Sequence, residues 1–273
     1  MRWFRSIIQC IATIISSFSF WLCVVFIIFL FMTSSLYFEM EMGQTKDCSV
    51  FHGVVIILSG VGTIPEYVNS YMALCSVNGS WMTLFAPIVV CYVFIPYLKR
   101  IEGNGYKRFY VHRMGRKAYL AEMFLSAIFT GACLMMVSYI IYSVLVVAIL
   151  PGTALEGLYS DVGISSYLME IVLMLLSLFL YGALWCAITV TLSIYIRNTY
   201  VLLSLPFLVN YGLDVLERHN PDVMQCSITS LLSLHNDKPP GMVLEIVAVY
   251  ILVLMVLFII YYLCCMRKRD FCE

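Results

Sequence analysis

Residues 119–150 read YLAEMFLSAIFTGACLMMVSYIIYSVLVVAIL, and this stretch decides the class of fold. A helix of about 20 residues is long enough to cross the hydrocarbon layer of a membrane. This stretch is longer than that, so we expect a transmembrane helix that tilts or projects beyond the bilayer.

The rest of the chain has the same character. Of 273 residues, 62% are hydrophobic and 12% charged, whereas soluble domains have about 45–50% and about 25%. A soluble domain of this size cannot bury so much apolar surface, which excludes soluble enzymes, nucleic-acid-binding proteins and disordered proteins. No internal repeat or linker divides the chain. We therefore expect one all-α integral membrane domain over residues 1–273.

Six apolar runs are long enough to cross a bilayer. Each should be a helix, because backbone polar groups in lipid must be paired within their own segment. The first run is too long for a signal peptide and no A-x-A cleavage site follows it, so we interpret it as an uncleaved span. The six predicted spans are residues 11–34, 81–98, 119–150, 167–196, 200–216 and 242–265.

The basic residues orient this arrangement. All but three of the 16 Lys and Arg residues fall on one side of six spans, the exceptions being Lys46, Arg218 and Lys238. Loops rich in Lys and Arg stay in the cytoplasm. Both termini are therefore expected to be cytoplasmic in a multi-pass protein of the cell membrane.

Two outer loops contain short apolar pieces. Residues 54–58, bracketed by glycines and Pro65, are too short to span and predicted to be too broken for a continuous helix. Residues 228–234 are a candidate half-inserted helix. A disulfide between Cys48 and Cys75 stays open, because sequence does not show whether the two cysteines are close.

The loop between the second and third spans is basic and aromatic. Gly103 and Gly105 should end the preceding helix, and Gly115 should break the chain again. The residues between them suffice for a short helix of two to three turns along the membrane surface. A plain alternative is a solvated loop, or one that binds anionic lipid headgroups.

Motifs for chemistry within the chain are missing. No G-x-x-x-x-G-K-[ST] sequence is present to cradle a nucleotide triphosphate. No H-E-x-x-H or paired C-x-x-C sequence is present either, and the four His residues are scattered over three loops, so no metal site is expected. The sequence predicts a non-enzymatic chain with no cofactor of its own.

Two groups of residues resemble a known family. Glu102-x-x-Gly105, followed by a short helix that runs into Arg113-Met-Gly-Arg-Lys-Ala-Tyr-Leu120, resembles the ABC type-2 permeases of bacteria. The segments Tyr181-Gly-Ala-Leu-Trp185, Ser193-Ile-Tyr-Ile-Arg-Asn198 and Leu205-Pro-Phe207 resemble the fourth and fifth spans of that family.

This resemblance implies that the short helix is a coupling helix, which docks in a groove of a separate ATPase subunit. The implied coupling residues are Glu102, Gly105, Tyr106, Lys107, Arg108, Phe109, Tyr110, Arg113 and Arg116. The chain would then be the permease subunit of an ATP-driven exporter. Its expected partners are ABC ATPase subunits that bind ATP and Mg, and a second copy or a sister permease. The substrate would be an unidentified amphiphilic or hydrophobic peptide, lipid or drug.

Polar and aromatic residues within the spans are candidates for a substrate path. Pro206 should bend the fifth span, and Asn210 and Asp214 follow it on one helical face. Tyr181 and Trp185 lie one turn apart in the fourth span. The alternative for Asn210 is a hydrogen bond between helices, and for the two aromatic rings it is packing.

Two other classes of function remain open. An ATP-independent secondary carrier or channel would usually place ionisable groups near mid-membrane, whereas most acidic residues here lie toward the span ends. A membrane enzyme, or an immunity or sensor protein that binds a toxic peptide without moving it, is the third hypothesis.

Overall fold

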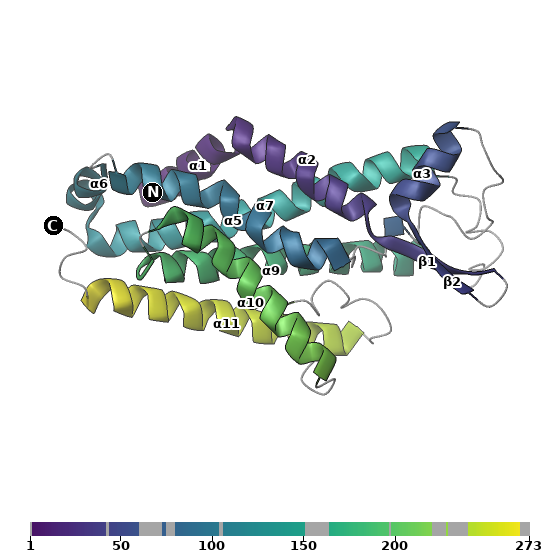
Figure 1. The fold of residues 1–273 in the computed structure, drawn as a ribbon. Helices are drawn as coiled ribbons and strands as arrows, with labels where there is room; N and C mark the ends of the chain where they lie inside the picture. Colours follow the sequence, from purple (N-terminus) through teal and green to yellow (C-terminus); the bar gives the residue numbers. More distant parts are fainter. Residues whose placement is uncertain are drawn as a thin grey trace.

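The computed structural model describes residues 2–41, 44–59, 73–74, 80–103, 106–150, 164–196, 198–219, 228 and 240–267. The long helices lie side by side along one axis (Figure 1). The described helices are α1 (Arg2–Ile15), α2 (Phe18–Met32), α3 (Val50–Ser59), α5 (Ser80–Gly103), α6 (Tyr106–Met114), α7 (Arg116–Ile149), α9 (Ile164–Ser193), α10 (Thr199–His219) and α11 (Pro240–Arg267). The strands are β1 (Ser35–Glu41) and β2 (Gln44–Ser49).

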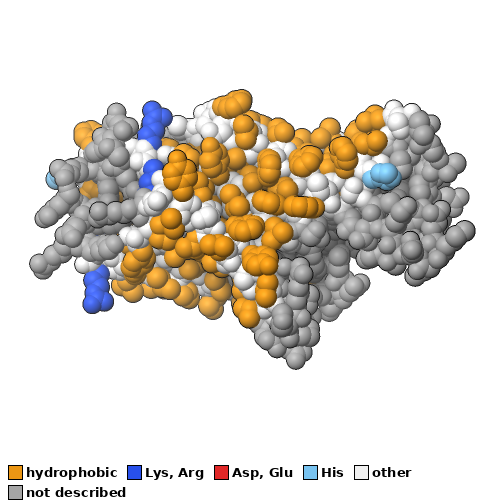
Figure 2. Space-filling view, viewed as in Figure 1, with side chains coloured by type: hydrophobic (Ala, Val, Ile, Leu, Met, Phe, Trp, Pro, Cys, Tyr) orange, Lys and Arg blue, Asp and Glu red, His pale blue; other side chains and the backbone are white. Residues whose placement is uncertain are grey.

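The two ends of the bundle differ. The start of α1, the short helix α6 and the end of α11 meet at one end, here called the α6 end (Figure 1). The strands and α3 lie at the opposite end, here called the hairpin end. In Figure 2, hydrophobic side chains cover the flank between the ends, and the coloured Lys and Arg side chains lie at the α6 end.

Several helices match the length of a bilayer. Within the described residues, α5, α7, α9 and α11 can each cross a membrane by length and composition, and α1 with α2 adds at most a fifth crossing. These helices make the chain a multi-pass helical membrane protein. The fifth predicted span corresponds to α10, whose described apolar part, Thr199–Leu213, is only about 22 Å long.

The first predicted span is not one straight helix, which corrects the sequence-based expectation. Residues 11–34 are divided between α1 and α2, which meet at an angle of 65°. Two adjacent serines, Ser16 and Ser17, stand at the break. Ser17 Oγ accepts a hydrogen bond from the Phe20 N–H at 3.3 Å, and Ser16 Oγ donates to the Thr13 carbonyl at 3.0 Å. Such local bonds satisfy helix ends and favour a break over a continuous helix.

The hairpin end departs from the prediction in two ways. Strands β1 and β2 form an antiparallel hairpin, with Glu39 opposite Lys46, that the sequence reading did not anticipate. The prediction that residues 54–58 are too broken for a continuous helix is wrong, because α3 runs through Gly53. Ser49 Oγ accepts the His52 N–H at 3.2 Å, which stabilises the first turn of α3.

Helices α7 and α9 approach each other closely at two glycines. A Cβ atom on Gly131 would lie 2.5 Å from Cys186 Sγ and 2.6 Å from the Gly182 carbonyl oxygen. A Cβ atom on Gly182 would overlap the Gly131 carbonyl. Small residues are favoured at helix contacts in membranes because they let two backbones approach closely. The two glycines therefore set the spacing of the central helix pair.

Candidate functional site

The predicted short helix between the second and third spans is confirmed as α6. Phe109, His112 and Arg113 are exposed on it, Phe109 to 64%, whereas Val111 packs against the core. The three exposed residues stand at positions i, i+3 and i+4, so they share one face of the helix. An aromatic ring and a cationic side chain therefore project together at the α6 end.

Other predicted coupling residues cannot be assigned to this face. Gly105 lies outside the described residues. The backbone is described but the side chain is not for Glu102, Tyr106, Lys107, Arg108 and Tyr110.

Gly115 forms the corner between α6 and α7, as the sequence predicts. Its φ of 84° and ψ of 150° belong to a region that essentially only glycine adopts. Its N–H donates to the Val111 carbonyl at 2.9 Å, and its own carbonyl accepts the Tyr119 N–H at 3.1 Å. The corner therefore ends one helix and starts the next without an unpaired backbone group at this glycine.

Arg116, one of the predicted coupling residues, lies against α11. Its guanidinium donates to the Cys265 carbonyl at 2.5 Å. The last carbonyls of a helix have no partner within the helix, and a cation there is favourable. Arg116 therefore ties the start of α7 to the end of α11, and it does not extend the exposed face of α6.

Glu122 is a buried carboxylate near the α6 end that sequence reasoning passed over. It is 2% exposed, and its Oε1 accepts a hydrogen bond from Ser6 Oγ at 2.6 Å. Its Oε2 has no hydrogen-bond partner among the described residues. Across all the residues that the structure describes, no group of three or more His, Cys, Asp or Glu side chains is placed to hold a metal ion. Glu122 therefore links α1 to α7.

Asn210 joins α10 to α5. Its side chain is fully buried, and Nδ2 donates to the Thr83 carbonyl. Pro87 explains why that carbonyl is available, because proline has no N–H to bond the carbonyl four residues before it. The arrangement matches the alternative of a hydrogen bond between helices.

An aromatic row continues the contact between α5 and α10. Trp81 stacks on Phe85 with ring centroids 5.8 Å apart, and Phe85 meets Phe207 at 6.1 Å. Pro206 is buried beside this row, in a helix that runs on to His219. The side chain of Asp214 lies outside the described residues.

Tyr181 and Trp185 lie in the bundle core on α9. Both are fully buried, and their rings meet edge to face at 6.4 Å. Next to them, Cys91 on α5 lies 2.9 Å from Thr189 Oγ1 on α9. These two aromatic residues therefore belong to the contact of α9 with α5, whereas Asn210 belongs to the contact of α10 with α5.

Two features missed from sequence have recognisable signals. Gly131 and Gly182 are small residues in long apolar runs, and small residues in such runs often mark helix contacts. Glu122 is the lone charged residue of its run, and ionisable residues within spans usually face the bundle interior.

Comparison with models of protein families, with curated proteins and with solved structures finds no match in any of the three. The function is therefore argued from the residues of this chain.

Proposed function

We propose that this chain is the membrane-spanning subunit of an ATP-driven exporter, held at α6 by a separate ATPase that binds ATP and Mg. It would work with a second copy or a sister permease and move an amphiphilic or hydrophobic substrate outward. The observation that carries the proposal is that Phe109, His112 and Arg113, among the described side chains of α6, are exposed on one face. Aromatic and Arg side chains of this kind are enriched at protein interfaces.

The packing of α6 offers a route for mechanical coupling. Helix α6 contacts both α5 and α7, and α5 in turn packs against α2, α9 and α10. A displacement of α6 by an ATPase would therefore reach most of the bundle through one helix. Repacking of helices around a rigid element is a common form of switching between states.

Six crossings with a cytoplasmic α6 end complete the proposal. The whole of α10 has 21 residues, about 32 Å, so its length would allow a sixth crossing beside the four that composition supports and the fifth that the bent pair α1–α2 adds at most. The exposed basic residues Arg5, Arg113 and Arg267 at the α6 end favour the cytoplasmic side for this end.

The test is co-purification of an ATPase with the full-length chain from the cells in which it naturally occurs. We expect a P-loop ATPase and vanadate-sensitive ATP hydrolysis with the unchanged protein. The double variant Phe109→Ala, Arg113→Glu should reduce that hydrolysis by about tenfold or more, because interface energy concentrates in such side chains. The matched control is Arg267→Glu, which reverses an exposed charge at the same end but off α6.

Two results would contradict the proposal. Equal ATPase recovery with the α6 variant, at equal membrane insertion, would exclude this face as the docking site. Substrate movement in vesicles that hold only this chain and an ion gradient would favour the ATP-independent carrier.

A further inference from the structure

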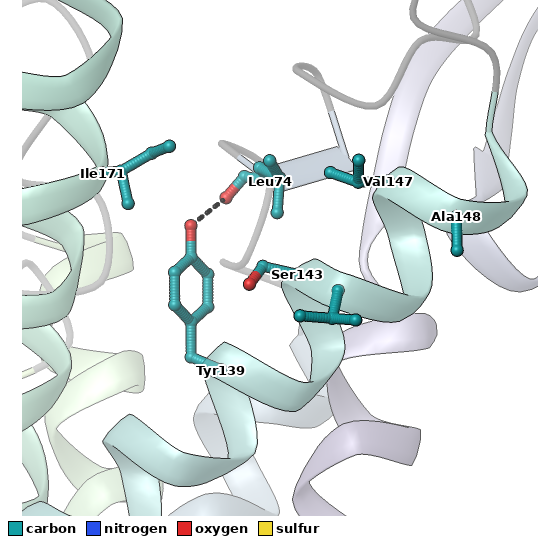
Figure 3. Close-up of a pocket in the computed structure, with 7 residues that line it drawn as sticks. Leu74, Tyr139, Ser143, Val147, Ala148 and Ile171 are labelled. Carbon is teal, nitrogen blue, oxygen red and sulfur yellow. Dashed lines mark hydrogen bonds between the residues drawn. The ribbon is translucent and has the colours of Figure 1, made fainter.

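At the hairpin end, α7 and α9 part around an open pocket of ≈ 350 Å³. Its walls include Tyr139, Ser143 and Val147 of α7 and Ile171 of α9 (Figure 3). Leu74, which precedes α5 in the chain, closes one side. The pocket is therefore built from three separate parts of the sequence.

The closed side of the pocket is held in place by hydrogen bonds. Tyr139 Oη donates to the Leu74 carbonyl at 3.2 Å, and Tyr142 Oη donates to the Ala73 carbonyl at 2.9 Å. Phe31 of α2 packs against both tyrosine rings, with centroids 6.1 and 5.3 Å away. These contacts hold residues 73–74 against α7 and fix this wall of the pocket.

The side chains that line the pocket suit an uncharged, apolar ligand. Among the described residues that line the pocket, the polar side chains are Tyr139 and Ser143, and both hydroxyl protons are used, Ser143 donating to the Ile140 carbonyl at 2.8 Å. Each trapped water would need two to four polar partners, so water fills such a space poorly. An empty space would forfeit dispersion contacts along its walls.

The mouth of the pocket lies on the lipid-facing flank. Val144 and Val147 at the pocket are 65% and 57% exposed, and Val172 beside it is 54% exposed. Ile171 lies on α9, in the described stretch Ile171–Ser193 that can cross a membrane. The opening is therefore continuous with the apolar flank of the bundle.

We propose that this pocket binds the alkyl chain of a membrane amphiphile, which enters sideways from the lipid between α7 and α9. The volume is at the low end of small-molecule pockets, about 300–1,000 Å³, so it suits one chain. The inference rests on the membrane location of the bundle and is independent of any ATPase.

The probe is a phosphatidylcholine with a diazirine in its acyl chain, mixed into phosphatidylglycerol and phosphatidylethanolamine vesicles that contain the full-length protein. After illumination, mass spectrometry locates the crosslinks. We expect a higher yield per residue at Ser143, Val147 and Ile171 than at Leu252, which is 62% exposed on α11. Equal yields at both places would overturn the proposal, because they would indicate ordinary lipid contact.

Two variants at position 143 distinguish the effect of filling the pocket from the effect of removing the hydroxyl group. Ser143→Phe should abolish the pocket crosslinks by occupying the space, whereas Ser143→Ala, which keeps the space and removes the hydroxyl, should retain them. Ile171→Phe fills the pocket from the opposite wall and serves where Ser143→Phe does not fold. Crosslinks that persist in a folded, filled variant would overturn the proposal.

Discussion

Asn210 and Pro87 act on the same backbone carbonyl. Pro87 lacks the N–H that would bond the Thr83 carbonyl within α5, and the side-chain amide of Asn210 donates to that carbonyl instead. Removing the amide with Asn210→Leu leaves the Thr83 carbonyl without this donor in the contact between α5 and α10. We expect the free energy of unfolding to fall by about 0.5–1.5 kcal/mol, the range of hydrogen bonds between membrane helices. Unfolding by sodium dodecyl sulfate in mixed micelles, followed by tryptophan fluorescence, measures the change.

The control for this hydrogen bond is a double-mutant cycle. Pro87→Ala restores an N–H that can bond the Thr83 carbonyl within α5. In that background, Asn210→Leu should cost clearly less. The same cost in both backgrounds would mean that Asn210 acts through something other than the carbonyl freed by Pro87.

Gly182 has a different role, because it leaves room for a neighbouring backbone. Gly182→Ala should lower the free energy of unfolding by about 1–3 kcal/mol, since the new methyl group would overlap the Gly131 carbonyl. Gly212→Ala is the matched control, because a Cβ there meets nothing within 4 Å. It should raise stability by about 0.5–1 kcal/mol, as alanine favours helix. Equal effects of the two variants in the same unfolding assay would argue against a close α7–α9 contact.

At the scale of elements, Gly115 sets the direction of α6 relative to α7. Gly115→Ala should strain the corner by about 1–3 kcal/mol, because its backbone conformation suits only glycine. We expect α6 to reorient while the bundle stays folded. Spin labels at positions 112 and 267 would report a changed distance. Lys117→Ala, in the first turn of α7, is the control and should leave that distance unaltered.

Elements with a strong local signal could be predicted from the sequence. The long apolar runs predicted α7 and α9, and the glycines on either side of α6 predicted where that short helix begins and ends. The break between α1 and α2 has a local signal in Ser16 and Ser17. It was missed because both serines lie within a long apolar run that predicts one continuous span. The hairpin β1–β2 had a weaker one, because a two-stranded hairpin depends on its surroundings for stability.

The candidate site was less predictable, because its partners are distant in sequence. Arg116 contacts Cys265 and Asn210 contacts Thr83, and no spacing rule links positions so far apart. The sequence of the loop also does not indicate which of its side chains are exposed. Phe109 and Arg113 project from α6, whereas Arg116, three residues after Arg113, is turned toward α11.

At the scale of the whole molecule, hydrogen bonds tie the first and the last described helix to one end of the bundle. Ser6 bonds Glu122, and Arg116 bonds the Cys265 carbonyl, so α1 and α11 both meet the start of α7. Because the two terminal helices meet at one end, we predict an even number of crossings. With the basic residues of this end, the arrangement predicts that α6 and both termini share the cytoplasmic side.

Epitope tags test this arrangement directly. Tags at the N-terminus, after His112 and at the C-terminus should all be protected from antibody in intact cells and become accessible together after permeabilisation. A tag after Ser59, at the end of α3, should be accessible in intact cells, because the hairpin end faces outward when the basic end faces inward. Opposite accessibility of the two termini would mean an odd number of crossings. Such a result would exclude α10 or the bent pair α1–α2 as a crossing, and with it the six-span arrangement on which the proposed coupling at α6 rests.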